Sequence, residues 1–344
     1  MTQIKVDTIA DAAGTGAADF ADGITVAGGA LSALNTAEYY SSASEPTSPK
    51  NGAIWWDTIN EKVMVYIAGE FKEVELGGAD GPVNWTISDI SSATYDSVSF
   101  DTGAQDVSMN SLFFSTDGTK MFAAGHSTDT VYEYSLSTGF DLSTASYNSV
   151  SLSISGQDTY PKGLSFSSDG TKMYVSGDTK DNVHQYTLTS AWDLSTASYD
   201  SVSYNPHAAL GSVEFNNDGT KMYTTFLGAP ASIRQHTLST AWDLSTASYD
   251  SVSFSTSSQE TQPWGVCFNP EGTQMFVTGY SSDRVHQYTL FTAFDLSTAS
   301  YDSLSLNVVL QEDRPSSIRF NADGSKMFVL GYYNDDVFQY STGL

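Results

Sequence analysis

A glutamine followed by a carboxylic acid recurs four times along the sequence, and these acids are the first candidates for chemistry. They are Asp106, Asp158, Glu260 and Glu312. Carboxylates that converge near one axis could hold a cation or a sugar. The alternative, which we favour, is that they are hydrated or cap the loops that carry them.

A second set of four acids, Asp141, Asp193, Asp243 and Asp295, begins the recurring pentapeptide Asp-Leu-Ser-Thr-Ala. The neighbouring residues supply hydroxyl groups but no further carboxylates at the spacing that calcium ligands need. We therefore expect each aspartate to close an Asx-turn onto the following backbone N–H groups, and we expect no metal site.

The histidines and the single cysteine follow the repeat as well. His184 and His286 occupy a repeat position that holds phenylalanine at Phe338, so we interpret them as packing or surface residues. Cys267 lies inside an apolar strand-like run, which favours a core position over a reactive thiol. No phosphate-binding loop, nucleophile elbow or zinc spacing is present. The sequence thus predicts no catalytic residue, no cofactor and no enzymatic activity.

The elements that carry these residues are set by two repeated signatures. The turn Asp-Gly-Thr-Lys-Met or a close variant begins at residues 117, 169, 218, 271 and 323, at intervals of 49 to 53 residues. The motif Trp-Asp-Leu-Ser-Thr-Ala-Ser-Tyr-Asp-Ser-Val-Ser runs from Trp192 and again from Trp242, with weaker copies from Phe140 and Phe294 and a divergent one from Asp89. A period near 50 residues with strand-like content is typical of propeller blades.

Each repeat contains four expected strands. The first carries an invariant aromatic column, and the Asp-Gly step after it supplies the positive φ of a tight hairpin. The array opens with a copy of the fourth strand at 95–100 and ends with a copy of the third at 337–340. The sequence therefore predicts an all-β fold, a five-bladed β-propeller over residues 85–344 whose last blade is completed by its earliest strand.

Three segments precede the ring. Residues 1–40 can bury little apolar surface and are expected to form an extended arm that a neighbour holds in place. Residues 41–76 contain three short strands of a small β-meander, in which Trp55 and Trp56 are expected to pack against a partner rather than to stack on sugars. Residues 77–84 have the composition of a linker.

Composition limits the partners. The net charge is −26, with 14 Lys and Arg against 40 Asp and Glu. Nucleic acids and anionic membranes both attract basic surfaces, so neither is expected to bind. The sequence begins without the features of a signal peptide and contains no apolar run of membrane-spanning length, so we expect synthesis in a cytoplasm and no membrane insertion.

Aromatic and basic residues vary between repeats in two sets of loops, one between the second and third strands and one between successive repeats. In a propeller both sets lie on one face, and loops on a rigid scaffold often carry recognition residues. The candidate contact residues are Trp264, Tyr160, Tyr332, Tyr333 and Arg314.

The repeat unit, with Asp-Gly-Thr-Lys-Met-Tyr-Val and Trp-Asp-Leu-Ser-Thr-Ala-Ser-Tyr-Asp-Ser, resembles propeller repeats of virion proteins of marine bacteriophages over residues 85–341. The opening Met-Thr-Gln-Ile-Lys-Val-Asp-Thr-Ile and the run Gly-Ala-Ile-Trp-Trp-Asp at 52–57 are similar to tail-fibre proteins of such phages. The resemblance implies a virion component, attached to other virion proteins through the arm and assembled as a homotrimer.

Three roles are open to such a protein. The first is a tail fibre or receptor-binding adhesin whose propeller face touches a host surface glycan or protein. The second is a head fibre or capsid decoration protein. The third is a glycan-cleaving enzyme, which would need two carboxylates at a suitable separation.

Overall fold

The computed structural model describes residues 84–344 and seven short strands before them, and it divides the chain into the units Met1–Gly81 and Pro82–Leu344. The early strands are β1 (Ile4–Val6), β2 (Ile24–Val26), β3 (Gly29–Ala30), β4 (Tyr39–Ser42), β5 (Ile54–Asp57), β6 (Lys62–Ile67) and β7 (Glu70–Val74). Strands β5, β6 and β7 form the expected antiparallel meander, to which β4 adds a parallel strand. The side chains of Trp55 and Trp56 lie outside the described residues.

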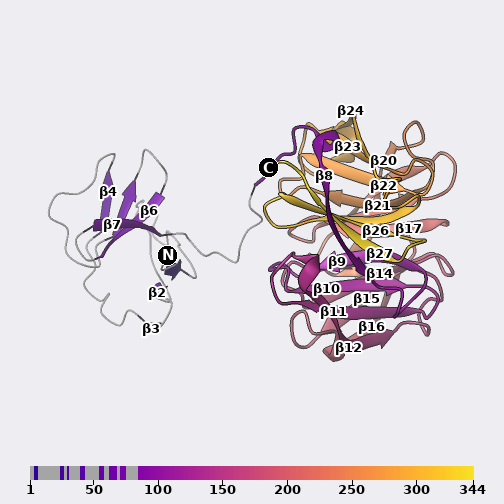
Figure 1. Cartoon of the computed structure of the whole chain (residues 1–344), viewed down its shortest axis with the longest axis horizontal. Coiled ribbons are helices and arrows are strands. Elements are labelled where there is room, and N and C mark those ends of the chain that lie inside the picture. The colour runs from indigo at the N-terminus through magenta and orange to yellow at the C-terminus, as the bar shows by residue number, and fades with distance from the viewer. Residues whose placement is uncertain are drawn as a thin grey trace. The chain divides into compact units, whose positions relative to one another are not determined.

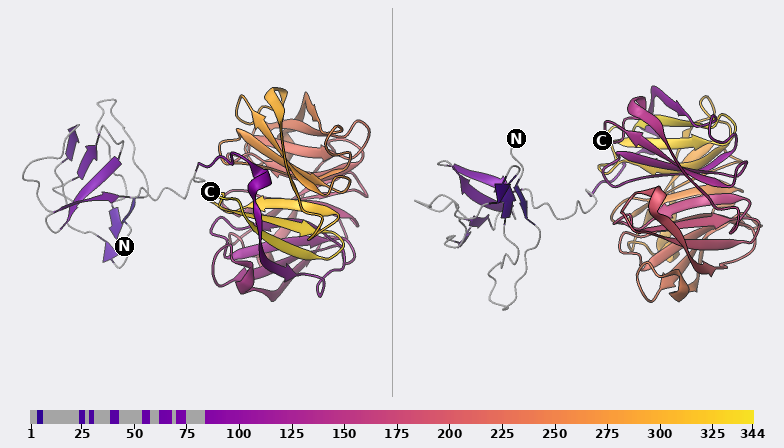
Figure 2. Two further views of the ribbon diagram at one scale, coloured as in Figure 1. Left: turned by 45° about the horizontal axis from the view of Figure 1, so that its top comes forward. Right: turned by 90° about the horizontal axis from the view of Figure 1, so that it is seen from below.

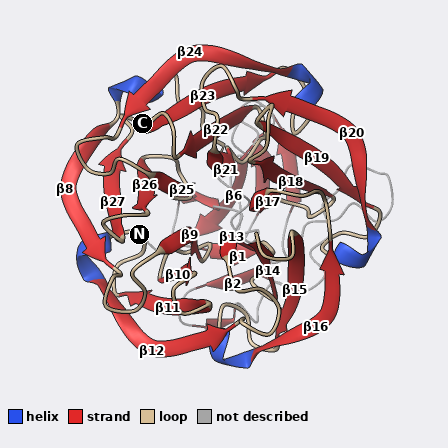
Figure 3. Ribbon diagram, turned by 90° about the vertical axis from the view of Figure 1, so that its right-hand side faces the viewer, coloured by secondary structure: helices blue, strands red, loops and turns tan. Residues whose placement is uncertain are grey.

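The second unit is a five-bladed β-propeller in which every blade is a four-stranded antiparallel sheet, as predicted (Figure 3). Blades 1 and 2 contain β9 (Met109–Phe114), β10 (Lys120–Gly125), β11 (Thr130–Leu136), β12 (Ala145–Ser153), β13 (Pro161–Phe166), β14 (Lys172–Gly177), β15 (Asn182–Leu188) and β16 (Ala197–Tyr204). Blades 3 and 4 contain β17 (Leu210–Phe215), β18 (Lys221–Phe226), β19 (Ser232–Leu238), β20 (Ala247–Ser255), β21 (Pro263–Phe268), β22 (Gln274–Gly279), β23 (Arg284–Leu290) and β24 (Ala299–Asn307). Blade 5 contains β25 (Pro315–Phe320), β26 (Lys326–Gly331), β27 (Asp336–Ser341) and β8 (Thr94–Asp101).

The ring closes through its earliest strand. Strand β8 pairs antiparallel with β27, so that Phe100 lies opposite Val337 and Thr94 opposite Ser341. Figures 1 and 2 show β8 alongside the last strands of the chain. This pairing confirms the predicted closure and leaves blade 5 with the same number of strands as the others.

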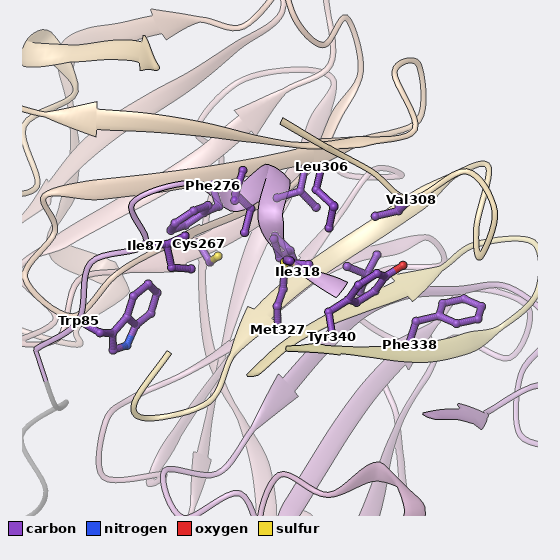
Figure 4. Close-up of a cluster of buried hydrophobic side chains, with 14 residues drawn as sticks. Trp85, Ile87, Cys267, Phe276, Leu306, Val308, Ile318, Met327, Phe338 and Tyr340 are labelled. Carbon is purple, nitrogen blue, oxygen red and sulfur yellow. The ribbon is translucent and has the colours of Figure 1, made fainter. Parts of the chain in front are cut away.

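The segment before β8 also fills the core between blades 4 and 5 (Figure 4). The ring of Trp85 lies 6.2 Å from that of Phe276 and 5.0 Å from that of Phe320, between centroids. Ile87 is buried in the same cluster. The closing segment therefore contributes packing as well as backbone hydrogen bonds.

The two repeated signatures contact each other inside each blade. The glycine of the Asp-Gly turn has positive φ throughout, as at Gly170 (φ 71°), which the hairpin prediction required. A Cβ placed on Gly170 would overlap the ring of Trp192, the first residue of the second signature. Trp85 takes this place beside Gly324 in blade 5. The divergent first copy of the motif thus begins at Trp85, four residues before the expected Asp89.

The second signature forms a short 3-10 helix, which the sequence did not predict. These helices are η2 (Ile90–Ser92), η3 (Leu142–Thr144), η4 (Leu194–Thr196), η5 (Leu244–Thr246) and η6 (Leu296–Thr298). The preceding aspartate accepts the expected Asx-turn bond, as Asp193 does from the backbone N–H of Ser195 at 3.1 Å. Within residues 84–344 and the strands before them, none of the helices has the length and apolar character to cross a membrane.

Side chains of the third strand of each blade accept hydrogen bonds from the backbone of the next blade. Gln235 Oε1 accepts the backbone N–H of Leu296 at 2.9 Å. The equivalent bonds join Glu133 to Leu194, Gln185 to Leu244, Gln287 to Ile90 and Gln339 to Leu142, at 2.8 to 3.2 Å. Each bond satisfies a buried N–H at the start of a 3-10 helix, so the ring of five bonds stabilises the closed state.

Arg319 joins the inner strands. Its guanidinium donates to the carbonyl oxygens of Leu112, Leu164 and Val266 at 3.0 to 3.4 Å and forms an ion pair with Glu214 at 2.7 Å. These residues belong to blades 1, 2, 4 and 3, so a single side chain of blade 5 contacts every other blade. Burial raises the pKa of Glu214, and the charge of Arg319 opposes that shift.

Candidate functional site

The two sets of variable loops lie on one face of the ring, as expected. In each blade a backbone hydrogen bond ties the loop after the second strand to the loop before the first. Two examples are the bond from Tyr280 N–H to Gln262 O at 3.2 Å and that from Tyr332 N–H to Arg314 O at 3.1 Å. The first strands pack side by side around the axis, so these paired loops surround its mouth (Figure 3). We call this side of the ring the loop face.

The register of every inner strand shifts at its start, and in blades 2 and 4 this irregularity directs a large side chain at the mouth. The register shifts between Pro161 and Gly163 in β13, and between Pro263 and Gly265 in β21. A bulge leaves one residue out of the alternation of a strand and turns its side chain in a new direction. The extra residue is Lys162 in blade 2 and Trp264 in blade 4, and their side chains meet at 4.3 Å from ammonium to ring centroid.

All five candidate contact residues line a single pocket of about 420 Å³ on the loop face. Its walls are Tyr160, Gln262, Trp264, Tyr280, Arg314, Tyr332 and Tyr333, from blades 2, 4 and 5. The volume falls within the range of small-molecule sites. The sequence prediction named five of the seven and missed Gln262 and Tyr280. Each of these lies in the loops already singled out, beside the hydrogen bond that joins them, so loop position was the available signal.

The aromatic rings of the pocket hold one another in place. Trp264 meets Tyr332 edge to face at 5.2 Å and lies 5.3 Å from Tyr280, between centroids. Tyr333 lies 5.7 Å from Tyr332 and remains 52% exposed, whereas Trp264 is 8% exposed. The pocket therefore has a buried aromatic floor and a solvent-facing aromatic rim, as expected of a preformed binding surface.

The ring of His126 extends this aromatic group into blade 1. It stacks on Tyr332 with an interplanar angle of 4° and lies 4.1 Å from Tyr160. Burial lowers the pKa of His126, so the imidazole is neutral at pH 7 and packs as an aromatic ring. Sequence reasoning noted the loop of His126 but did not select it.

Two basic side chains bring positive charge to this part of a strongly acidic protein. The guanidinium of Arg314 lies between the rings of Tyr280 and Tyr333, at 4.1 and 3.9 Å from their centroids. Lys162 is buried, and its ammonium lies over the rings of Tyr160 and Trp264 and 3.7 Å from the carboxylate of Asp178. Burial lowers the pKa of Lys162 and the Asp178 charge opposes that shift. Cation–π contacts of this kind fix the position of a charge without neutralising it.

The four repeated acids do not form a shared axial site, and this corrects one of the two interpretations of them. Asp106 accepts from the backbone N–H groups of Ser108, Ser127 and Thr128 at 2.9, 3.3 and 2.8 Å, and Asp158, Glu260 and Glu312 accept equivalent bonds in their own blades. All four are at most 2% exposed. Each carboxylate accepts hydrogen bonds from the loops of its own blade, so these acids cap the loops that carry them.

The remaining reactive residue types lie in the core or along the blades. Cys267 is buried, and burial raises the pKa of its thiol, as expected of a core residue. His184 and His286 are buried in β15 and β23. In the part of the chain that the structure describes, no group of three or more His, Cys, Asp or Glu residues has the arrangement of a metal site. The pocket walls contain no carboxylate and no thiol.

Comparison with known proteins adds only distant structural likeness. No family model and no curated protein matches the sequence. A functionally unknown protein from Desulfotomaculum acetoxidans has a TM-score of 0.42 at 12% identity, with 65% of this chain and 62% of that chain covered, which is less than two thirds of its length. A protein from Bacteroides uniformis, provisionally described as a 6-phosphogluconolactonase, has a TM-score of 0.43 at 14% identity, with 78% and 81% covered. The periplasmic gluconolactonase PpgL of Pseudomonas aeruginosa has a TM-score of 0.38 at 15% identity, with 72% and 63% covered.

Proposed function

We propose that this chain is a structural protein of a bacteriophage virion, a tail fibre or receptor-binding adhesin whose loop face contacts the host surface. The observation that carries the binding role is the convergence of residues from three blades on one aromatic pocket. The virion setting follows from the resemblance of the repeats and of the first residues to phage proteins. The unit Met1–Gly81 would attach the ring to the particle.

The chemistry of the pocket supports binding rather than catalysis. Its walls offer aromatic rings, one amide and one guanidinium, and every one of these groups can hold a ligand without reacting with it. Hydrolysis of a glycosidic bond requires two carboxylic acids on either side of that bond. The Gln-acid pairs, which recur in four of the repeats, direct their carboxylates at backbone N–H groups.

Aromatic rings and exposed hydroxyl and amide groups suit a carbohydrate. The C–H face of a pyranose covers an aromatic ring, while side chains such as Gln262 and Tyr333 bond its hydroxyl groups. A rigid scaffold lowers the ordering cost of binding, since the rings are already packed before the ligand arrives. The proposed ligand is thus a glycan of the host envelope.

The test is binding of the fluorescently labelled full-length protein to a panel of marine bacteria. Tyr333→Ala removes half-exposed aromatic area from the pocket, and Tyr249→Ala, at a tyrosine 42% exposed on the outer strand β20, is the matched control. We expect Y333A to reduce cell binding about tenfold and Y249A to leave it unchanged. Equal binding by wild type and Y333A on every strain that the wild type binds would reject the pocket as the contact site.

A further inference from the structure

We infer that the pocket selects an acidic sugar, one whose carboxylate is bound by Arg314. This inference rests on the proposed glycan-binding function and adds the chemical class of the ligand. It begins from the contacts of the Arg314 guanidinium in the pocket wall. Its two faces are covered by Tyr280 and Tyr333, at 4.1 and 3.9 Å. Its edges, which carry the N–H donors, have no partner: within residues 84–344 the guanidinium donates no hydrogen bond and forms no ion pair.

Arg319 shows how this chain treats an arginine with a structural role. That guanidinium is saturated by three carbonyl oxygens and by Glu214. Arg314 is partly exposed, is held between two aromatic rings, and has none of these acceptors. A planar donor fork that is held rigid but left unpaired matches a planar acceptor with two oxygens, which is the geometry of a carboxylate.

Arg314 is the charged side chain in the walls of the pocket, although the whole chain is acidic. Lys162 is buried over the ring of Trp264, and its charge is compensated by Asp178 at 3.7 Å. Burial and the charges of Asp313 and Glu260 raise the pKa of Asp283, and the Arg314 charge opposes that shift. Within residues 84–344 neither Asp283 nor Asp313 forms an ion pair with Arg314. Charges farther than about 8 Å away are largely screened at physiological salt, so the net charge of −26 does not decide binding in the pocket.

The rest of the pocket places the sugar ring of such a ligand. Tyr333, 52% exposed, presents apolar area beside the packed edge-to-face pair of Trp264 and Tyr332, and Gln262 offers both an amide donor and an acceptor. A hexuronic acid has one apolar face, several hydroxyl groups and one carboxylate. These three features correspond to the aromatic rim, the Gln262 amide and the Arg314 fork.

The experiment compares uronic acids with the hexoses from which they differ only at C6. Ligand-observed NMR measures the binding of glucuronate, galacturonate and mannuronate, and of glucose, galactose and mannose, to the full-length protein. We expect at least one uronate to bind about tenfold more tightly than its hexose, since hydrogen bonds to a charged group contribute about that factor. Sulfated galactose separates a carboxylate preference from a general preference for anions.

Two variants assign the effect to Arg314. Arg314→Gln should abolish the difference between uronate and hexose. Arg234→Gln is the matched control, because Arg234 also stacks on an aromatic ring, Phe226 at 4.0 Å, but lies outside the pocket walls and has the same charge. The control variant should keep the full preference, and it changes the net charge by the same amount as R314Q.

The inference is overturned if uronates and hexoses bind equally, if none of the six sugars binds, if sulfated galactose binds as well as the uronates, or if R314Q keeps the preference. These results are distinguishable from failure of the proposed function. If Y333A still loses cell binding while the sugars show no acidic preference, the pocket is the contact site and only the ligand class is wrong. If Y333A binds cells like the wild type, the contact site itself is wrong.

Discussion

Replacing Asp335 by asparagine should make the ring more stable at neutral pH, because this carboxyl is buried among other acids at the closing seam. Asp335 is 7% exposed, and its Oδ1 accepts the backbone N–H of Met109 at 3.1 Å, which joins blade 5 to blade 1. Burial, followed by the charges of Asp106, Asp101 and Asp336, raises its pKa from 3.8 to about 6. Asparagine keeps the acceptor, removes the charge and tolerates the left-handed backbone found there (φ 55°).

The sign and size of the effect follow from this shift. A pKa that is higher in the folded state means that folding favours the protonated form. The corresponding stability is fully present below pH 3.8 and is lost as the pH rises through about 6. The full shift corresponds to about 3 kcal/mol. A neutral amide accepts the Met109 N–H bond less strongly than a carboxylate does, which offsets part of this, so we expect a net gain of about 1 kcal/mol at pH 7.5. The advantage of D335N should therefore be largest above pH 7 and fall by about half at pH 5.

The assay is thermal unfolding of the full-length protein followed by circular dichroism at pH 5.0, 6.0, 7.0 and 8.0, all above the isoelectric point near 4.1. A gain of about 1 kcal/mol raises the Tm by about 2–4 °C in a domain of this size. Asp181→Asn is the control, since Asp181 has the same left-handed turn (φ 53°) and accepts from Leu210 N–H at 3.2 Å. A D335N gain that does not change with pH, or a loss of stability at pH 8.0, would refute the reasoning.

Two further predictions concern the packing of the ring. Gly170→Ala should destabilise the protein by about 1–3 kcal/mol, because the added Cβ meets the ring of Trp192 and the backbone has positive φ. Gly156→Ala is the control, and it should change the free energy of unfolding little because nothing lies within 4 Å of the added Cβ. Equal Tm values for the two variants would contradict this. Arg319→Leu should lower the free energy of unfolding by about 3–5 kcal/mol, since it leaves Glu214 buried without its partner. The double variant R319L/E214L should recover most of that loss. Purely additive losses in a double-mutant cycle measured by urea denaturation would argue against the ion pair.

The architecture could be predicted from sequence because the same local interactions are repeated in every blade. The Asp-Gly step determines a hairpin by its own backbone preference, and the repeat phase determines how the last sheet is completed. The hairpin follows from a short segment and the closure from the order of the strand copies, so both can be predicted from the sequence. The sequence indicates the divergent first copy only from Asp89, because Trp85 precedes the residues that match the motif, and its place in the blade becomes evident from its contact with Gly324.

The site was only partly predictable because it depends on residues that break the repeat. Loop variation indicated Trp264 and Arg314, but not that a β-bulge turns Trp264 toward the mouth of the ring. Tyr280 follows an ordinary strand ending, and its role in the pocket depends on its contacts with Arg314 and Trp264. The carboxylates, by contrast, follow the repeat, and their regularity reflects the same capping bonds in each blade rather than a shared site.

The most direct test of the central claim is a structure of the full-length protein bound to a glycan purified from the envelope of a bacterium to which it adheres. The account predicts one sugar residue in the loop-face pocket, packed against Trp264 and Tyr333, with its carboxylate on Arg314. A glycan bound along the outer strands, or on the unit Met1–Gly81, with the pocket empty, would contradict it.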